Sequence, residues 1–305
     1  MADELILLGT WISPYSTRVK IALAEKGVDY EFREEDLSNK SPLLLKMSPV
    51  HKKIPVLIHN GKPVCESLII VQYIDEVWNH KSPLLPSDPH YRSHARFWAD
   101  YIAKDNKMHS AGSQLLFSTG EAQETAKNDL IGYLKVLEGE LGDKPYFGGE
   151  TFGFVDVALI PSYNFFCVCD QFGNFGIMVE CPSLVVWAHR CMEKESVSKS
   201  LPDQHKAYDF CLELKKKFEA KRSCLVFEEV QQNQIAINGL FKKSDELCNL
   251  CGTEAAVITL SNAGNTFAFG NPSVDSVLDR YLSMTSSSSR ASASFSSLFR
   301  HRVST

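Results

Sequence analysis

The sequence predicts an α/β domain followed by an all-α domain, with a small α+β appendage towards the C-terminal end. Three observations support this. Short apolar runs alternate with amphipathic stretches over the first eighty or so residues, and helical periodicity then continues from Tyr91 to about Phe218. Beyond Lys217 the composition changes again, becoming rich first in amides and then in serine. A chain of 305 residues suits two compact domains and an additional segment.

The first eighty residues are predicted to follow the order β-α-β-(α)-β-β-α, which is that of a thioredoxin-like domain. Gly9 and Gly27 end the first strand and the first helix, and Asn60-Gly61 is a hairpin signal between two short strands. The expected elements are a strand at 4–8, a helix from Ser13-Pro14 to Gly27, a strand at 30–33, two strands flanking Asn60-Gly61 and a helix from Glu66 to about Trp78.

The second domain contains one segment, Phe154 to Phe166, that is almost wholly apolar and is expected to be buried on all sides. Gly153 would cap its start, and Asp156 would reach back to the capping backbone N–H. The predicted organisation is a thioredoxin-like domain at 1–80, a linker at 81–89, an all-α domain at 90–218, the appendage at 219–283 and a disordered Ser-rich tail at 284–305.

Composition excludes several classes of function. The formal net charge of -5 does not favour a polyanionic partner, and no apolar run approaches the ~18 residues of a membrane span. The chain starts with acidic rather than basic residues, and its nine cysteines are unevenly spaced, which predicts reduced thiols and a cytoplasmic protein. Cys167-x-Cys169 and Cys248-x-x-Cys251 each lack a second ligand pair, so no metal site is expected.

Ser13 is the first candidate for chemistry. It precedes Pro14 at the mouth of the first helix, where the backbone N–H groups and the helix dipole favour an anion such as a thiolate. The alternative is that Ser13 is only an N-cap, a common role for serine at this position.

A second group of residues suits the ends of an extended, charged peptide. Ile54 before Pro55 could offer backbone groups if that peptide bond is cis. Glu66 and Ser67 stand at a helix start, where an α-amino acid head would find N–H groups, a hydroxyl and a carboxylate. Taken singly, Glu66 and Ser67 also fit a first-turn acid and a cap, and Lys40 and Lys53 also fit solvated surface cations; these candidates are Lys40, Lys53, Ile54, Pro55, Glu66 and Ser67.

Several motifs together resemble the glutathione site of plant tau-class glutathione transferases. The resemblance covers residues 1 to about 218. The motifs are Trp11-Ile12-Ser13-Pro14-Tyr15, Asn39-Lys40-Ser41-Pro42, Lys52-Lys53-Ile54-Pro55, Cys65-Glu66-Ser67, Gln72-Tyr73-Ile74-Asp75, Phe97-Trp98-Ala99-Asp100-Tyr101, Phe154-Val155-Asp156 and Lys194-Glu195-Ser196-Val197.

The resemblance implies the glutathione transferase fold and a role for each candidate. Ser13 would donate a hydrogen bond to the glutathione thiolate and Ile54 would pair with the cysteinyl backbone beside cis-Pro55. Lys40 and Lys53 would hold the glycyl carboxylate, and Glu66 with Ser67 would take the γ-glutamyl end. The family conjugates this thiolate to a hydrophobic electrophile as a homodimer, with glutathione as co-substrate and no further cofactor.

The electrophile pocket departs from the family pattern. Family members usually have aromatic residues soon after the segment 97–101, whereas this chain reads Asn106-Lys107-Met108-His109-Ser110. Tyr15, Met108 and Phe165 are candidate pocket walls by position, although apolar residues on helices more often belong to the core. His109 receives no role from the sequence, because family members of this type do not need a histidine here.

Residues 238–252 and 270–275 resemble part of a plant type I MADS domain, which a transferase does not normally carry. That family has a basic helix that approaches DNA and a two-stranded sheet that forms a dimer, here expected at 255–260 and 266–269. The basic stretch is replaced by Leu225 to Gln232, and from Glu219 onward eight basic residues face eight acidic ones. Phosphate neutralisation would be poor, so nucleic acid is not an expected partner.

Three alternatives to a transferase remain open from the sequence. A Cys-dependent reductase would need a thiolate nucleophile at the helix entrance, and Ser13 occupies that place. A non-catalytic carrier could bind hydrophobic molecules in the same cleft. A DNA-binding or dimerising regulator could act through the MADS-like segment.

Overall fold

The computed structural model describes residues 4–81, 83–103, 107–173, 176–251, 255–260, 266–271, 273–277 and 279. The chain divides into two units, Met1–Phe218 and Glu219–Thr305, which are considered separately. The expected disordered tail at 284–305 lies outside the described residues. Within the described part of the chain, no helix combines the length and apolarity needed to cross a membrane.

The first unit begins with a four-stranded sheet of order β2-β1-β3-β4. Strands β1 and β2 are parallel, whereas β3 is antiparallel to both β1 and β4. This is the predicted thioredoxin-like arrangement. Its elements are β1 (Leu5–Gly9), α1 (Pro14–Lys26), β2 (Glu31–Glu34), α2 (Pro42–Met47), β3 (Val56–His59), β4 (Lys62–Cys65) and α3 (Ser67–Val77).

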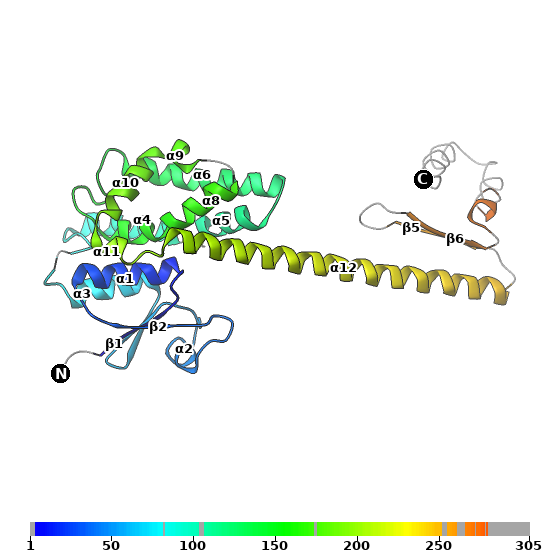
Figure 1. Cartoon of the computed structure of the whole chain (residues 1–305), viewed down its shortest axis with the longest axis horizontal. Coiled ribbons are helices and arrows are strands. Elements are labelled where there is room, and N and C mark those ends of the chain that lie inside the picture. Colours follow the sequence, from blue (N-terminus) through cyan, green and yellow to red (C-terminus); the bar gives the residue numbers. More distant parts are fainter. Residues whose placement is uncertain are drawn as a thin grey trace. The chain divides into compact units, whose positions relative to one another are not determined.

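Alternation along β1 builds a core on both faces of this sheet, because successive strand residues point to opposite sides. Leu5 and Leu7 belong to the large core cluster together with buried residues of α1 and α3, whereas Ile6 and Leu8 pack with Leu44 of α2. Helices α1 and α3 therefore cover one face and α2 the other (Figure 1).

Local signals in the sequence explain how these elements begin and end. Ser13 caps α1 with Pro14 at its first position, and Gly27 ends it in the left-handed conformation at φ 61°. Asn60 and Gly61 both have positive φ angles between the paired residues His59 and Lys62, as a two-residue hairpin turn requires. Each feature follows the sequence prediction.

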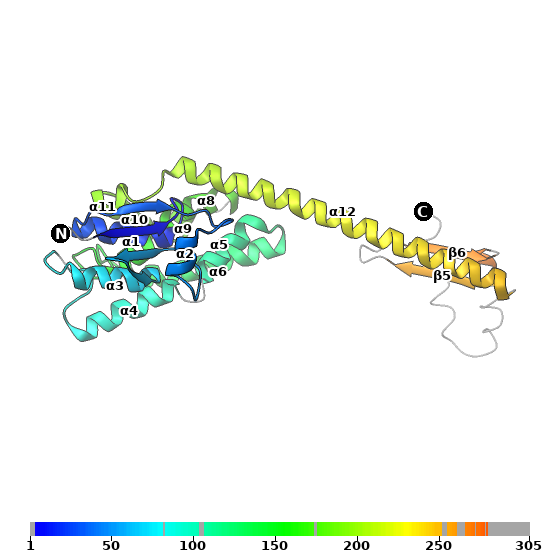
Figure 2. The same cartoon turned by 90° about the horizontal axis from the view of Figure 1, so that it is seen from below.

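The second domain of this unit is all-α, also as predicted (Figures 1 and 2). The apolar segment from Phe154 to Phe166 differs from the prediction in one respect. It was expected to form a single element, whereas the structure divides it among α7, a 3₁₀ turn (η2) and the start of α8. Pro161, at the start of the 3₁₀ turn, cannot donate the backbone hydrogen bond that would continue α7. The elements are α4 (Pro89–Ala103), α5 (Lys107–Phe117), α6 (Glu121–Leu141), α7 (Phe154–Leu159), η2 (Ile160–Ser162), α8 (Tyr163–Gly173), α9 (Ile177–Glu180), α10 (Pro182–Met192) and α11 (Glu195–Ser198).

The start of α7 is held by Asp156, which is fully buried. Its carboxylate accepts hydrogen bonds from the Gly153 N–H at 2.8 Å, the Phe147 N–H at 3.1 Å and the Trp187 indole N–H at 2.7 Å. The cap predicted from Gly153 and Asp156 is therefore present. The same carboxylate also binds Phe147 and Trp187, which lie outside α7.

Helix α12 (Gln204–Cys251) starts in the first unit and continues across residue 218, where the sequence analysis places a domain boundary. This 48-residue segment contains no proline and a single glycine, Gly239, so nothing in it breaks the helix. In the second unit, β5 (Ala255–Leu260) and β6 (Thr266–Asn271) form an antiparallel pair at the predicted positions (Figure 2). Phe241 stacks on Phe269 of β6 with ring centroids 5.7 Å apart.

Candidate functional site

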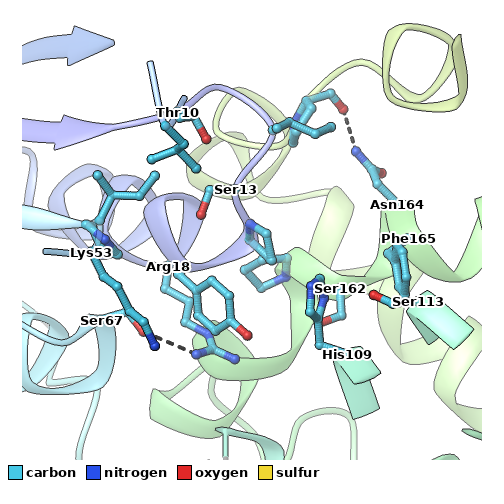
Figure 3. A pocket seen from close by; sticks show the side chains of 18 of the residues that line it. Thr10, Ser13, Arg18, Lys53, Ser67, His109, Ser113, Ser162, Asn164 and Phe165 are labelled. Carbon is cyan, nitrogen blue, oxygen red and sulfur yellow. Dashed lines mark hydrogen bonds between the residues drawn. The ribbon is translucent and has the colours of Figure 1, made fainter. Parts of the chain in front are cut away.

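One cavity of about 660 Å³ in the first unit is lined by every residue that the sequence analysis proposed for the site. Its wall includes Ser13, Tyr15, Lys40, Lys53, Ile54, Pro55, Glu66, Ser67, Met108 and Phe165. The labelled side chains separate into two sides (Figure 3). Thr10, Ser13, Lys53 and Ser67 lie on the side of the thioredoxin-like domain, and the other side is formed by α5, η2 and α8.

Ser13 lies at the N-terminus of α1 and faces this cavity. Its Oγ accepts a hydrogen bond from the Ser16 N–H at 3.3 Å, which is a capping interaction. The hydroxyl keeps its own proton to donate, so the capping role and an anion-binding role are compatible. The positive end of the α1 dipole points at the same place.

The start of α3 is the second anion-binding feature. Glu66 adopts a positive φ of 69° and provides no side-chain cap, so the first N–H groups of α3 remain open. A positive φ is uncommon for a residue other than glycine and often marks a functional site. Ser67 is buried, and its Oγ accepts a hydrogen bond from Arg18 Nη1 at 3.2 Å.

Arg18 is a site residue that the sequence analysis missed. Its guanidinium is buried, lies 5.1 Å from the Tyr15 ring centroid and donates from Nε to the Ala158 carbonyl at 2.8 Å. Burial lowers the pKa of Arg18 to about 10, which leaves it cationic at neutral pH, and burial raises the pKa of Tyr15. The sequence contained one sign of this role, because Arg18 is a charged residue directly before the apolar inner face of the first predicted helix.

Two exposed lysines and the backbone just before β3 complete this side of the cavity. Lys40 and Lys53 are exposed at its edge. The β3–β4 ladder starts with Val56 opposite Cys65, so Ile54 lies just beyond the paired region. The Ile54–Pro55 peptide bond is cis, as expected.

The opposite side of the cavity combines apolar and polar groups. Met108 is buried, and the His109 ring lies 6.3 Å from the Tyr15 centroid and 5.6 Å from that of Phe165. Ser113 and Ser162 line the cavity beside them (Figure 3). The partial burial of His109 against these rings lowers the pKa of its imidazole below the ordinary value.

The first turns of α12 form a further wall that the sequence analysis missed. Phe210, Cys211 and Leu214 line the cavity, and the Trp11 and Phe210 rings meet edge to face with centroids 5.6 Å apart. Helical periodicity alone could not distinguish these residues from ordinary core positions. Among the described residues, no three His, Cys, Asp or Glu side chains gather as metal ligands would.

Gly112 on α5 makes room for Phe165, and this gives a first prediction. A Cβ atom at position 112 would lie 2.1 Å from Phe165 Cε1. We expect Gly112→Ala to lower the free energy of unfolding by about 1–3 kcal/mol, because the ring must move out of its place. Chemical denaturation measures this change.

Gly132→Ala is the matched control for Gly112→Ala. Gly132 lies inside α6, and a Cβ placed there would have no heavy atom within 4 Å apart from its chain neighbours and the backbone of its own helix. Because alanine favours helices over glycine, this variant should gain about 0.5–1 kcal/mol. Equal stabilisation of both variants would contradict the packing role assigned to Gly112.

Comparison with protein families agrees with this geometry. The glutathione S-transferase N-terminal domain matches residues 3–76, and the glutathione S-transferase C-terminal domain matches residues 100–195. Residues 237–269 match the SRF-type transcription factor DNA-binding and dimerisation domain, which agrees with the MADS-like resemblance of the appendage.

Similar proteins cover the same part of the chain. Probable glutathione S-transferase parC of Nicotiana tabacum is 60% identical over 217 residues, which are 71% of this chain and 97% of the relative. Glutathione S-transferase U19 of Arabidopsis thaliana is 59% identical over 218 residues, 72% of this chain and 99% of the relative.

Solved structures show the same likeness. Rice GST1 in complex with glutathione has a TM-score of 0.68 and 47% identity, and the match covers 71% of this chain and 98% of that one. The tau-class glutathione S-transferase of mango, Mangifera indica, has a TM-score of 0.65 and 41% identity over 70% of this chain and 98% of its own. With this fold, this cavity and these relatives, the chain belongs to the glutathione S-transferase family and is similar to its plant tau-class members.

Proposed function

We propose that the chain conjugates the thiolate of glutathione to hydrophobic electrophiles in the 660 Å³ cavity. The observation that carries this proposal is the convergence of two helix N-termini, those of α1 and α3, on the side of the cavity formed by the thioredoxin-like domain. The start of α3 offers open backbone N–H groups and the Ser67 hydroxyl to a negative charge, and the start of α1 offers the Ser13 hydroxyl and the positive end of its helix dipole.

Glutathione would lie along this side as an extended peptide. The open N–H groups of α3 and the Ser67 hydroxyl would receive the γ-glutamyl carboxylate, and Glu66 would face its ammonium. The backbone of Ile54 would pair with the cysteinyl residue, and Lys40 and Lys53 would neutralise the glycyl carboxylate. This pose brings the sulfur to Ser13.

The reaction would begin when the thiol loses its proton to water. The Ser13 hydroxyl and the α1 dipole would stabilise the thiolate, and each unit of lowered thiol pKa is worth about 1.4 kcal/mol. The sulfur would then attack the electrophilic carbon. With an aryl chloride, a C–S bond would form and chloride would leave. With a hydroperoxide, the thiolate would attack the terminal peroxide oxygen, the O–O bond would break, and the alkoxide would leave as an alcohol after taking a proton from water. A second glutathione would then reduce the resulting sulfenic acid, giving glutathione disulfide and water.

We further propose that the reaction uses glutathione as co-substrate and needs no metal or redox cofactor, because thiolate attack requires neither. We place the enzyme in the cytoplasm as a homodimer. Unevenly spaced cysteines support a reducing compartment. For the dimer, the support is the family membership together with apolar side chains exposed on α3 and α4, namely Ile69, Tyr91 and Phe97.

Turnover of 1-chloro-2,4-dinitrobenzene by the full-length chain separates this proposal from a non-catalytic carrier. We expect rates that saturate in both glutathione and aryl halide, because both sides of the cavity must be filled. Retention on glutathione-agarose without turnover would favour the carrier instead.

The appendage is not expected to bind DNA, which is a second prediction. Residues 219–305 hold eight basic and eight acidic residues, so few phosphates could be neutralised. In a gel-shift assay with an A·T-rich duplex, the full-length chain should give no shift even at low salt. A shift whose affinity falls steeply with added salt would contradict this prediction.

A further inference from the structure

The loop between β2 and α2 carries two residues of the cavity wall, Leu37 and Lys40 (Figure 1). It follows Glu35 and ends at Ser41, the N-cap of α2. Residues 36–40 are all exposed. A short, exposed loop keeps one conformation only where its contacts outweigh its conformational entropy. The contact that Lys40 would make with a glycyl carboxylate therefore depends on whatever holds this backbone.

The buried carboxylate of Glu35 links the two ends of the loop. Glu35 is 6% exposed. Its Oε1 accepts a hydrogen bond from the Ser41 hydroxyl at 2.7 Å, and its Oε2 accepts one from the Ser41 N–H at 3.2 Å. The Glu35 N–H donates to the Gly9 carbonyl at 2.8 Å, which attaches the start of the loop to the end of β1. Because hydrogen bonds are stronger away from water, these contacts hold the loop against the sheet.

The interior of the loop is a turn with bonds of its own. Asp36 Oδ1 accepts from the Ser38 N–H at 2.9 Å and from the Ser38 hydroxyl at 2.6 Å, and the Asn39 N–H donates to the Asp36 carbonyl at 3.1 Å. These bonds shape the turn but do not fix it relative to the cavity. Lys40 lies between the turn and Ser41, so the Glu35–Ser41 contact sets the place from which its side chain extends.

We propose that Glu35 is a positioning residue for glutathione, and that its buried contact with Ser41 holds Lys40 where it meets the glycyl carboxylate. This inference rests on the proposed function. A loop that is already ordered loses little freedom when the peptide binds, so Glu35 contributes to affinity rather than to attack on the electrophile. Its loss should raise KM for glutathione and leave kcat and the pKa of the bound thiol unchanged.

The test uses the full-length chain with glutathione and with γ-glutamylcysteine, and 1-chloro-2,4-dinitrobenzene is the electrophile. γ-Glutamylcysteine presents no carboxylate at the glycyl position. The readout is the ratio of kcat/KM for glutathione to kcat/KM for γ-glutamylcysteine. Glu35→Gln keeps the side-chain volume but turns an amide NH₂ towards one Ser41 donor, and we expect the ratio to fall about three- to tenfold. A smaller folded fraction would lower both rates equally and would not change the ratio.

Two further variants show whether the effect passes through Lys40. Lys40→Ala should lower the ratio at least as far as Glu35→Gln, and the double variant should fall little below Lys40→Ala alone, because residues that act through one contact are not additive. Glu31→Gln is the matched control. Glu31 lies on the same strand, and its exposed carboxylate pairs with Arg33 at 2.7 Å outside the cavity wall, so the ratio should keep its wild-type value.

An unchanged ratio in Glu35→Gln or in Lys40→Ala would overturn the inference. A fall in Glu35→Gln that adds fully to that of Lys40→Ala would also overturn it, as would an equal loss with both peptides, since either result would show a general structural role. Equal use of the two peptides by the wild type would remove this inference and leave conjugation standing. Failure of the wild type with both peptides would remove the proposed function as well.

Discussion

Ser13→Ala is expected to lower kcat/KM for aryl-halide conjugation by about 10²- to 10³-fold, the usual effect of removing one donor from a developing or bound anion. The Ser13 hydroxyl is the side-chain donor at the start of α1, and it faces the cavity. The variant should also lose about 1 kcal/mol of folding free energy, because alanine lacks the Oγ with which Ser13 accepts the Ser16 N–H. Steady-state kinetics and chemical denaturation measure the two effects separately.

Ser41→Ala provides the matched control for Ser13→Ala. Ser41 caps α2 with Pro42 at the first position, and its Oγ accepts the Leu44 N–H at 3.0 Å, but it does not line the cavity. This variant should lose stability and leave the pKa of the bound thiol unchanged. If Ser41→Ala and Ser13→Ala reduced turnover alike, Ser13 would be acting only as a cap.

Asp156→Ala should lower the free energy of unfolding by about 3 kcal/mol at neutral pH. The substitution leaves the N–H donors of Phe147, Gly153 and Trp187 without their acceptor inside a buried cluster, and unpaired buried donors are costly. Urea denaturation measures the loss. Asp88→Asn is the control, since Asp88 caps His90 and Tyr91 at an exposed site where asparagine caps equally well.

The loss in Asp156→Ala should also depend on pH. Burial raises the pKa of Asp156 from 3.8 to about 6, against the opposing effect of its hydrogen-bond donors. Between these values the folded chain binds a proton that the unfolded chain does not, so this carboxyl's contribution to stability falls as the pH rises. Because alanine does not titrate, the gap between wild type and variant should be about 1.4 kcal/mol wider at pH 5 than at pH 7.5. A gap that narrows on acidification would contradict the raised pKa.

The sequence alone predicts those parts of the fold that depend on local rules. The Ser13-Pro14 start, the Gly27 end and the Asn60-Gly61 turn each require particular residues at particular backbone angles, and each appears where expected. The Gly153–Asp156 cap follows for the same reason. The break at Pro161 also had a local signal, but the strong apolar pattern around it favoured a single helix.

Contacts between distant segments could not be predicted in this way. Arg18 reaches Ala158, which is 140 positions away, and Gly112 accommodates Phe165 from another helix. Phe210 and Leu214 face the cavity because α12 packs there, although their spacing is that of any amphipathic helix. The electrophile side is built mainly from such contacts, which is why His109 had no assignable role from the sequence.

The most direct test of thiol activation at the start of α1 is an ultraviolet titration of glutathione bound to the full-length chain. Thiolate absorbance followed from pH 5 to pH 9 reports the pKa of the bound thiol. We expect a midpoint well below the value of about 8.5 for a free cysteine thiol, and a return towards that value in Ser13→Ala. The same midpoint near 8.5 in both proteins would contradict the account, because Ser13 and the α1 dipole would then not stabilise the thiolate.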